Sequence, residues 1–228
     1  YLSSRQCQQV DRRAIDEYGM LGLVLMENAA RGATNVLVEL MEKAHLPKRE
    51  GPVVVCCAGG NNGGDGLAMA RHLDLRGYAV EVLLWADPAK LSADSAANYA
   101  IVEKCEIPLK VLGPEYETRQ LASSLGSASW IVDALLGTGA RGEPRSPMDR
   151  VIDQLNESQV PILAIDVPSG MNCDTGQPSS HTIQAQATCT FVAAKLGFQK
   201  EVAKAHLGEL HVLDIGAPRK LIEEVISA

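Results

Sequence analysis

The sequence contains no apolar stretch long enough to span a membrane, and no signal-peptide pattern opens it. Its 228 residues carry a formal net charge of −7 with no basic stretch, which argues against general binding to nucleic acids or anionic membranes. Internal repeats, low-complexity segments and long linkers are also missing. We therefore expect one cytoplasmic domain over residues 1–228, and a start at Tyr1 rather than Met leaves open a removed targeting leader.

The six cysteines and five histidines show none of the spacings typical of zinc sites or redox motifs. Cys56 and Cys57 are neighbours in an apolar run, so we expect their side chains on opposite faces of a core strand. This pattern predicts buried, reduced thiols rather than a disulfide framework. The histidines are predicted to be surface or core residues rather than metal ligands.

Two common nucleotide-binding fingerprints are absent from the most glycine-rich stretch, residues 53–71. A G-x-G-x-x-G motif does not fit, because Gly64 and Gly66 are followed by Met69 at the third glycine position. No Lys-Ser/Thr pair follows the glycines, which excludes a P-loop. Asp87 lies where a dinucleotide-binding fold keeps its ribose-binding acid, but the proline after it favours a strand-ending turn.

The same stretch does contain an apolar run, Val53–Ala58, that enters a glycine-rich turn and then helical spacing. Strand, turn and helix in this order direct backbone N–H groups and a helix N-terminus at an anion. Asn61, Asn62 and Asp65 add polar side chains to the turn, which a simple phosphate site does not need. The stretch therefore predicts a ligand site with more than a phosphate-binding role.

Apolar strands alternate with helical segments along the rest of the chain. We predict strands at residues 79–85, 109–112, 187–193 and 209–213, and others that begin near residues 53, 130 and 161. We predict helices at residues 92–105, 115–125, 148–155 and 219–227, one after the glycine-rich turn, and two within residues 3–45, the first capped by Ser3 or Ser4. This alternation predicts an α/β fold with a mostly parallel sheet covered by helices on both faces.

The second of these helices contains the segment Met26–Arg31. Glu27 and Arg31 are four residues apart, which predicts an exposed ion pair. Asn28 lies among small apolar residues and needs hydrogen-bond partners if it is buried. The glycine-rich turn and a ligand are the two candidates for that partner.

Three apolar strands end in the same way, with polar residues and glycine. Their ends are Asn61–Asp65, Asp133 with Gly137–Gly142, and Asp166–Gly170. Since ligands of such sheets bind beyond the carboxyl ends of the strands, we expect the three ends to form one site. An aspartate that closes an apolar strand is costly unless a cation, hydrogen bonds or chemistry compensates, so a functional site is favoured over simple turns.

The oxygens of Asn62, Asp133 and Ser169 can together hold a hard cation, whose identity the residues alone leave open. Asp65 is predicted to be a structural cap or a hydroxyl acceptor rather than a base. Ser169 is not predicted to be a nucleophile, because no histidine lies in a motif that suggests a base for it.

Taken together, these motifs resemble the NAD(P)H-hydrate epimerase family, also called the YjeF N-terminal domain. The resemblance rests on residues 26–29, 61–66, 133–139, 166–170 and 187–197, in this order along the chain. It runs from the first helix to near the C-terminus, and the ordered set is specific although each motif alone is weak. Ala30 stands where many relatives have glycine, which concerns helix packing.

The resemblance implies a Rossmann-like three-layer sandwich that epimerises hydrated NADH and NADPH at C6 of the nicotinamide ring. It implies potassium bound by Asn62, Asp133 and Ser169, a homodimer, and an S-specific NAD(P)H-hydrate dehydratase as functional partner. The residues that it assigns to substrate binding are Asn61, Asn62, Gly63, Gly64, Asp65, Gly137, Thr138, Gly139, Ala140, Arg141, Gly142, Glu143 and Asp166.

Asp166 is our candidate for the catalytic acid and base, since one carboxyl group can protonate the departing hydroxyl and later accept a proton from water. Asp133 is not a candidate for proton transfer if it binds potassium. Arg141 is expected near the pyrophosphate. Lys195 either reaches phosphate or leaves its strand for solvent, so we assign it no catalytic role.

Two other functions stay open at this point. The domain can be a non-catalytic nucleotide-binding scaffold or dimerisation module that acts through protein partners, although such domains are expected to lose the aspartates and asparagines kept here. It can also be a nicotinamide oxidoreductase, which the missing fingerprint disfavours. A preference between the NADH and NADPH hydrates is not predicted.

Overall fold

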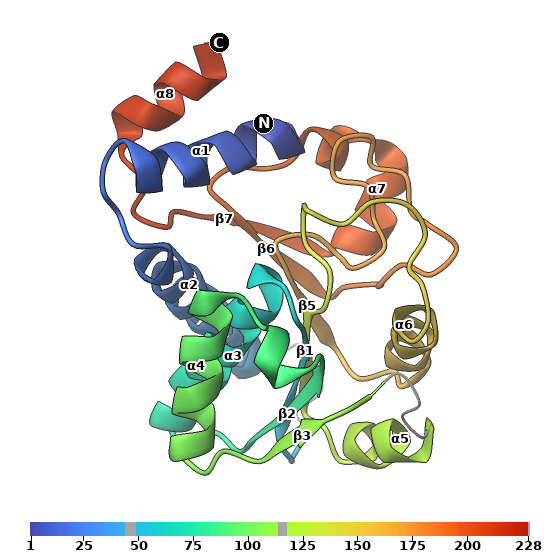
Figure 1. The fold of residues 1–228 in the computed structure, drawn as a ribbon. Helices are drawn as coiled ribbons and strands as arrows, with labels where there is room; N and C mark the ends of the chain where they lie inside the picture. Colours follow the sequence, from blue (N-terminus) through green and yellow to red (C-terminus); the bar gives the residue numbers. More distant parts are fainter. Residues whose placement is uncertain (44–48, 114–117, 228) are drawn as a thin grey trace.

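A computed structural model describes residues 1–43, 49–113 and 118–227 of the chain. Seven parallel strands form a single sheet in the order β3-β2-β1-β4-β5-β6-β7 (Figure 1). Their bounds are β1 Val53–Ala58, β2 Val80–Trp85, β3 Leu109–Val111, β4 Trp130–Ala134, β5 Ile162–Ile165, β6 Ala187–Phe191 and β7 Glu209–Leu213. The predicted parallel sheet is confirmed, and all its strand pairs are parallel rather than only most of them.

Helices cover both faces of the sheet, as the sequence predicts (Figure 1). Side chains of β1 alternate between the two cores: Val53, Val55 and Cys57 pack towards one, and Val54 and Cys56 towards the other. The helices are α1 Ser4–Asp16, α2 Gly22–Glu42, α3 Asn61–Leu75, α4 Ala93–Lys104, α5 Thr118–Gly126, α6 Met148–Glu157, α7 Glu201–Leu207 and α8 Arg219–Ser227.

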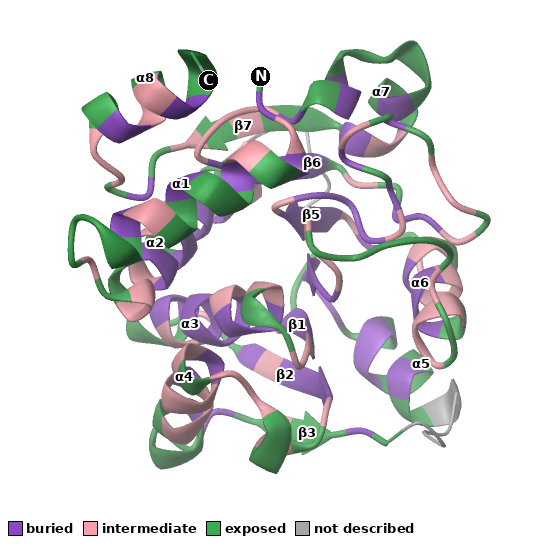
Figure 2. Cartoon of the chain, turned by 45° about the horizontal axis from the view of Figure 1, so that its top comes forward, coloured by how far each residue is buried: buried purple, intermediate pink, exposed green. Residues whose placement is uncertain are grey.

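One core lies under α1, α2, α3, α4 and α8, and the other under α5 and α6. Figure 2 shows that the central strands and most of α3 are buried, whereas α4 and β3 border solvent. A buried sheet between two helical layers is the predicted Rossmann-like sandwich. No helix in the described part of the chain is both long and apolar enough to cross a membrane.

The helix ends show where the local sequence decides the structure. Ser3 caps α1 with a full capping box, in which its side chain accepts from the backbone of Gln6 and the Gln6 side chain accepts from Ser3 N–H. Asp87 accepts from Ala89 N–H and caps the short 3-10 helix Pro88–Lys90, so the strand-ending turn predicted there is confirmed. All six cysteines are free, as predicted, but only five are buried, since Cys105 is exposed.

Several boundaries differ from those expected. The 3-10 helix Leu196–Gln199 and α7 were not predicted, because both are short and their apolar side chains pack into a small separate core. The predicted helix residues 44–45 and 115–117 lie outside the described residues. The stretch Asn61–Asp65, expected as a turn, is the first part of α3, with Gly60 as its N-cap.

Two interactions expected within α2 are formed elsewhere. Glu27 pairs with Arg71 and His72 of α3 rather than with Arg31. Asn28 donates its side-chain N–H to the carbonyl of Ile215, at 2.9 Å, rather than to the glycine-rich segment or towards a ligand. Both side chains therefore join α2 to neighbouring elements.

Candidate functional site

The carboxyl ends of β1, β4 and β5 meet around one cavity of about 460 Å³, which we call the main cavity. The residues that line it are Gln8, Ala58, Gly60, Asn61, Asn62, Asp65, Leu135, Leu136, Gly137, Thr138, Gly139, Ala140, Asp166 and Phe191. The three strand ends that the sequence marks therefore converge. Gln8 and Phe191 also line the cavity: Gln8 belongs to no motif that the sequence marks, and Phe191 lies in the motif at residues 187–197 but has no predicted role at the site.

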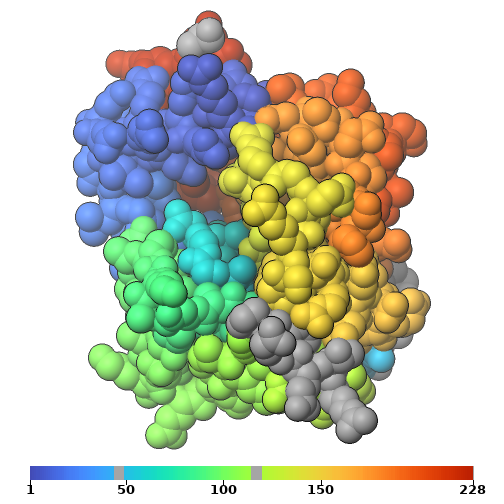
Figure 3. Space-filling view, turned by 45° about the vertical axis from the view of Figure 1, so that its right-hand side comes forward, coloured from blue at the N-terminus to red at the C-terminus, as the bar shows by residue number. Residues whose placement is uncertain are grey.

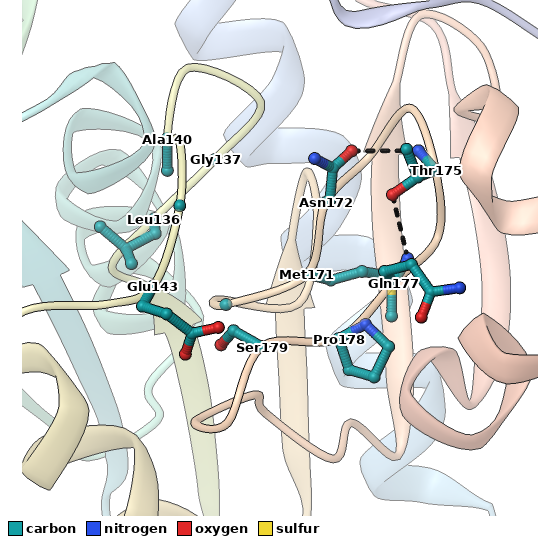
Figure 4. A pocket seen from close by; sticks show the side chains of 12 residues that line it. Leu136, Gly137, Ala140, Glu143, Met171, Asn172, Thr175, Gln177, Pro178 and Ser179 are labelled. Carbon is teal, nitrogen blue, oxygen red and sulfur yellow. Dashed lines mark hydrogen bonds between the residues drawn. The ribbon is translucent and has the colours of Figure 1, made fainter.

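A second hollow, the side cavity, has a volume of about 200 Å³ and lies on the other side of the loop after β4. In Figure 4, Leu136, Gly137, Ala140 and Glu143 of that loop face the segment that carries Met171 to Ser179. Gly142 also lines this cavity, and Glu143 accepts a hydrogen bond from Ser180 N–H at 2.9 Å. The two cavities share the wall formed by Leu136, Gly137 and Ala140.

The predicted residues Gly63 and Gly64 do not line either cavity. A Cβ on Gly63 would lie 1.8 Å from the carbonyl oxygen of Ala58, and one on Gly64 would lie 2.5 Å from Ser95 Oγ. Both glycines allow the start of α3 to pack tightly on its neighbours. The first turn of α3 is thereby held at the cavity, where its free N–H groups and helix dipole favour an anion.

Asp166 sits at the end of β5 with a φ of +67°, an uncommon conformation for a residue other than glycine. Its Oδ2 accepts from Thr138 N–H at 2.8 Å, and its Oδ1 lies 2.9 Å from Lys195 Nζ. Its side chain is 15% exposed and borders the main cavity. The left-handed backbone thus aims an anchored carboxylate at the cavity, which is typical of functional sites.

Lys195 is the main residue that sequence analysis missed. The side chain is 1% exposed and donates to the Phe191 carbonyl besides its pair with Asp166, so the predicted path to solvent or phosphate is wrong. Burial lowers the pKa of this lysine, but the charge of Asp166 and the thiol of Cys7 raise it more, so it stays above its ordinary value. The lysine is a buried cation that pairs with the candidate catalytic carboxylate.

Asp133 and Ser169 form a second buried pair just below the cavity, and neither is exposed. Ser169 Oγ donates to Asp133 Oδ1 at 2.6 Å, its N–H donates to Oδ2 at 2.9 Å, and Oγ accepts from Leu136 N–H at 2.9 Å. Burial raises the pKa of Asp133 to about 6, against the hydrogen bonds from Ser169, which lower it. Two of the three predicted cation ligands are therefore in contact.

Asn62, the third predicted cation ligand, lies in the wall of the main cavity. Both polar atoms of its side chain are buried and have no hydrogen-bond partner among the described residues. A Cβ on Gly137 would lie 3.3 Å from Asn62 Cγ and 2.9 Å from Asp166 Oδ2, so the glycine allows both side chains to approach the loop. An unpaired buried amide points to a ligand or ion not yet accounted for.

This donor set fits a hard cation. Amide, carboxylate and hydroxyl oxygens are the ligands that such ions prefer, and Asn62, Asp133 and Ser169 supply one of each. No group of three histidine, cysteine or acidic side chains in the described ranges could hold a metal ion.

Asp65 and Arg141 lie differently from their predicted positions. Asp65 is inside α3 rather than at its cap, and burial first, then the charges of Asp166 and Asp11, raise its pKa well above the ordinary value. Arg141 lines neither cavity: its guanidinium donates to Ser4 Oγ at 3.1 Å and lies 3.6 Å from Asp174. It ties the loop to the start of α1 instead of reaching towards phosphate.

Comparisons with known proteins agree with this architecture. A sequence model of the family described as "YjeF-related protein N-terminus" matches residues 22–197. The chain is 45% identical over 221 residues to the NAD(P)H-hydrate epimerase of Pirellula staleyi, which covers 97% of this chain and 94% of that protein. It is 38% identical to the protein of the same name from Rhodopirellula baltica, over 98% of this chain and 87% of that one.

Two further matches place this similarity in context. The bifunctional NAD(P)H-hydrate repair enzyme Nnr of Moorella thermoacetica is 36% identical over 97% of this chain, which spans 41% of that protein. The crystal structure of yeast ynu0, YNL200c, superposes with a TM-score of 0.81 over 98% of this chain and 92% of that one. At 22% sequence identity, this last match supports the fold alone.

Proposed function

The chain belongs to the YjeF-related N-terminal family, and we propose that it is an NAD(P)H-hydrate epimerase, an isomerase that interconverts the R and S forms of hydrated NADH and NADPH. Its similarity to two proteins of that name extends over nearly the whole chain. The observation that carries the proposal is the anchored Asp166 carboxylate, which faces a cavity at the carboxyl ends of the strands.

We propose that the dinucleotide lies along the loop after β4, across the main and side cavities. Among the described residues that line these cavities there is no lysine or arginine. The pyrophosphate is therefore expected to bind backbone N–H groups of that loop and of the first turn of α3, which the helix dipole supports. Arg141 contributes through the position of the loop rather than by contact.

The reaction requires a group that can transfer a proton at the hydrated carbon. The lone pair of the ring nitrogen expels the hydroxyl at C6 to give a delocalised cation, and water then adds to the other face. Asp166 is proposed to transfer the proton, and its negative charge also favours the cation. Lys195, which does not line the cavity, is proposed to hold the Asp166 carboxylate in place.

Asn62, Asp133 and Ser169 are the residues proposed to hold potassium, the ion that the family resemblance implies. A bound cation would supply a fixed positive charge next to the loop after β4. The buried side-chain amide of Asn62 supports the assignment, since it has no hydrogen-bond partner among the described residues. A rise in Tm with potassium chloride over choline chloride, lost in Asn62→Ala, is expected, and equal Tm values in both salts would contradict it.

We further propose that an S-specific NAD(P)H-hydrate dehydratase is the functional partner of this protein. Support comes from relatives named bifunctional repair enzymes, in which the part similar to this chain is about two fifths of the protein.

The proposed homodimer is tested by sedimentation velocity.

The direct test supplies both epimers of hydrated NADH, or of hydrated NADPH, to a dehydratase that consumes only the S form, and then adds this protein. Loss of the R form is expected to accelerate above the spontaneous rate of a control without it. An unchanged rate, with potassium present and ligand binding intact, would favour the non-catalytic scaffold instead. The oxidoreductase alternative is tested by adding NADH with carbonyl substrates, since an oxidoreductase would oxidise NADH and lower its absorbance.

A further inference from the structure

Helix α1 forms part of the wall of the proposed active site, although it precedes the residues that the family model matches. Gln8 lines the main cavity, while Asp11 and Ile15 line an adjoining cavity of about 120 Å³. These three residues are spaced three and four apart, so they share one face of the helix. Figure 3 shows the N-terminal residues at the upper border of a hollow that the loop near residue 140 also borders.

The adjoining cavity borders the main one. Both are lined by Asn61, Asp65 and Phe191, so a nicotinamide ring at that shared wall can be approached from two elements. Asp166, at the end of β5, lines the main cavity, and Asp11, on α1, lines the adjoining one. Besides Asp65, which lines both cavities, the site thus presents two carboxyl groups carried by independent parts of the fold.

Asp166 alone is poorly suited to both halves of the proposed reaction. Epimerisation removes a hydroxyl from one face of the ring and adds water to the other. Each Asp166 oxygen is already fixed, one by Lys195 at 2.9 Å and one by Thr138 N–H at 2.8 Å, so the carboxylate has little freedom to serve both faces.

We propose that Asp11 is a second catalytic residue, which transfers the proton on the ring face opposite Asp166; this inference rests on the proposed function. In one direction the Asp11 carboxylic acid protonates the hydroxyl, the C6–O bond breaks, and the ring nitrogen lone pair forms the C=N bond as water leaves. Water then forms a new C6–O bond on the other face, its proton passes to Asp166, and the nitrogen lone pair is restored. The return direction exchanges the two roles.

The electrostatics of the cluster agree with this assignment. Asp11 as a whole residue is exposed, but burial of its carboxyl group raises its pKa from 3.8 to about 6, with a further rise from Asp166 and an opposing effect of Lys195. The charge of Asp166 acts on both Asp11 and Asp65, and the Lys195 ammonium acts on Asp11 and Asp166. A carboxyl group with a pKa of about 6, as for Asp11, can both give and accept a proton near neutral pH, where acid–base catalysis is most effective.

The test compares Asp11→Asn with wild type, starting from each isolated epimer in ¹⁸O-labelled water. Asp11→Asn is expected to interconvert the epimers about 100-fold or more slowly, the usual loss for a missing acid–base group. It should still exchange the hydroxyl oxygen of one epimer with solvent, because Asp166 can serve its own face. Asp166→Asn should show the reverse preference, with exchange confined to the other epimer.

Asp16→Asn is the matched control, since Asp16 is an exposed aspartate at the end of the same helix and lines neither cavity. Asp11→Ser serves as a second variant if Asp11→Asn does not fold. Interconversion within about threefold of wild type, or equal loss of exchange with both epimers in a folded Asp11 variant, would overturn the assignment. No epimerisation by the wild type would instead reject the proposed function itself.

Discussion

The buried pair of Lys195 and Asp166 gives the sharpest prediction for stability. Lys195→Met keeps a flexible side chain of similar length but removes the ammonium, which leaves the Asp166 carboxylate without its cation and the Phe191 carbonyl without a donor. Removal of one partner from a buried ion pair costs about 3–5 kcal/mol. Because the Asp166 side chain is 15% exposed, we expect a loss near the lower end, about 3 kcal/mol in the free energy of unfolding.

Urea denaturation can measure this loss through fluorescence, since Trp85 and Trp130 are both buried and should report global unfolding. The double variant Lys195→Met/Asp166→Asn should be less unstable than the sum of the single variants, with a coupling energy of about 2 kcal/mol. Lys200→Met, at an exposed lysine, is the control and should change stability by less than about 0.5 kcal/mol. A loss below about 1 kcal/mol with additive single effects would refute the buried pair.

Three further variants test the cavity wall at Gly137, the buried pair of Ser169 and Asp133, and the carboxyl group of Asp11. Gly137→Ala should lower kcat/KM about 10- to 100-fold, because its Cβ would push against Asp166 and Asn62. Ser169→Ala should lose about 1–3 kcal/mol in thermal or urea unfolding, because a buried carboxylate and a backbone N–H lose their shared hydroxyl. Asp11→Asn should remove part of the pH dependence of stability: because the folded state binds this proton more tightly, the contribution of Asp11 to stability falls as pH rises from about 4 to about 6.

Each of these has a matched comparison. Gly126→Ala adds a Cβ with nothing within 4 Å at a position that lines neither cavity, so equal activity losses at Gly137 and Gly126 would contradict the steric argument. Ser169→Thr keeps the hydroxyl, and a loss no smaller than that of Ser169→Ala would argue against hydrogen bonding as the cause. For Asp11, urea midpoints at pH 4 and pH 7 suffice, and an identical pH profile in Asp11→Asn and wild type would show that its carboxyl group is not buried.

The sheet and the strand-end aspartates could be predicted because their signals are local. An apolar run followed by aspartate and glycine marks both β4 with Asp133 and β5 with Asp166, and parallel strands bring such ends to one edge. The start of α3 was misjudged, because glycines that are poor helix formers are accepted where neighbouring backbone leaves no room for a side chain.

The roles of Lys195 and Asp11 could not be predicted from their local sequence. A lysine after a strand ordinarily reaches solvent, and only the tertiary fold supplies the carboxylate that makes its burial tolerable. Asp11 looks like part of the polar face of an amphipathic helix, and its neighbour Asp166 is 155 positions away in the chain. The pairing of Arg141 with Asp174 could not be predicted for the same reason, because Asp174 lies on another loop.

The central claim is that an anchored Asp166 carboxylate epimerises hydrated nicotinamide dinucleotides. The most direct measurement starts from the isolated R form and follows the appearance of the S form by chiral chromatography, for wild type and Asp166→Asn. Asparagine tolerates the positive φ at this position, so the variant is expected to fold. The account predicts rapid interconversion by wild type and a loss of about 100-fold or more in the variant. A folded Asp166→Asn protein with wild-type turnover would contradict it.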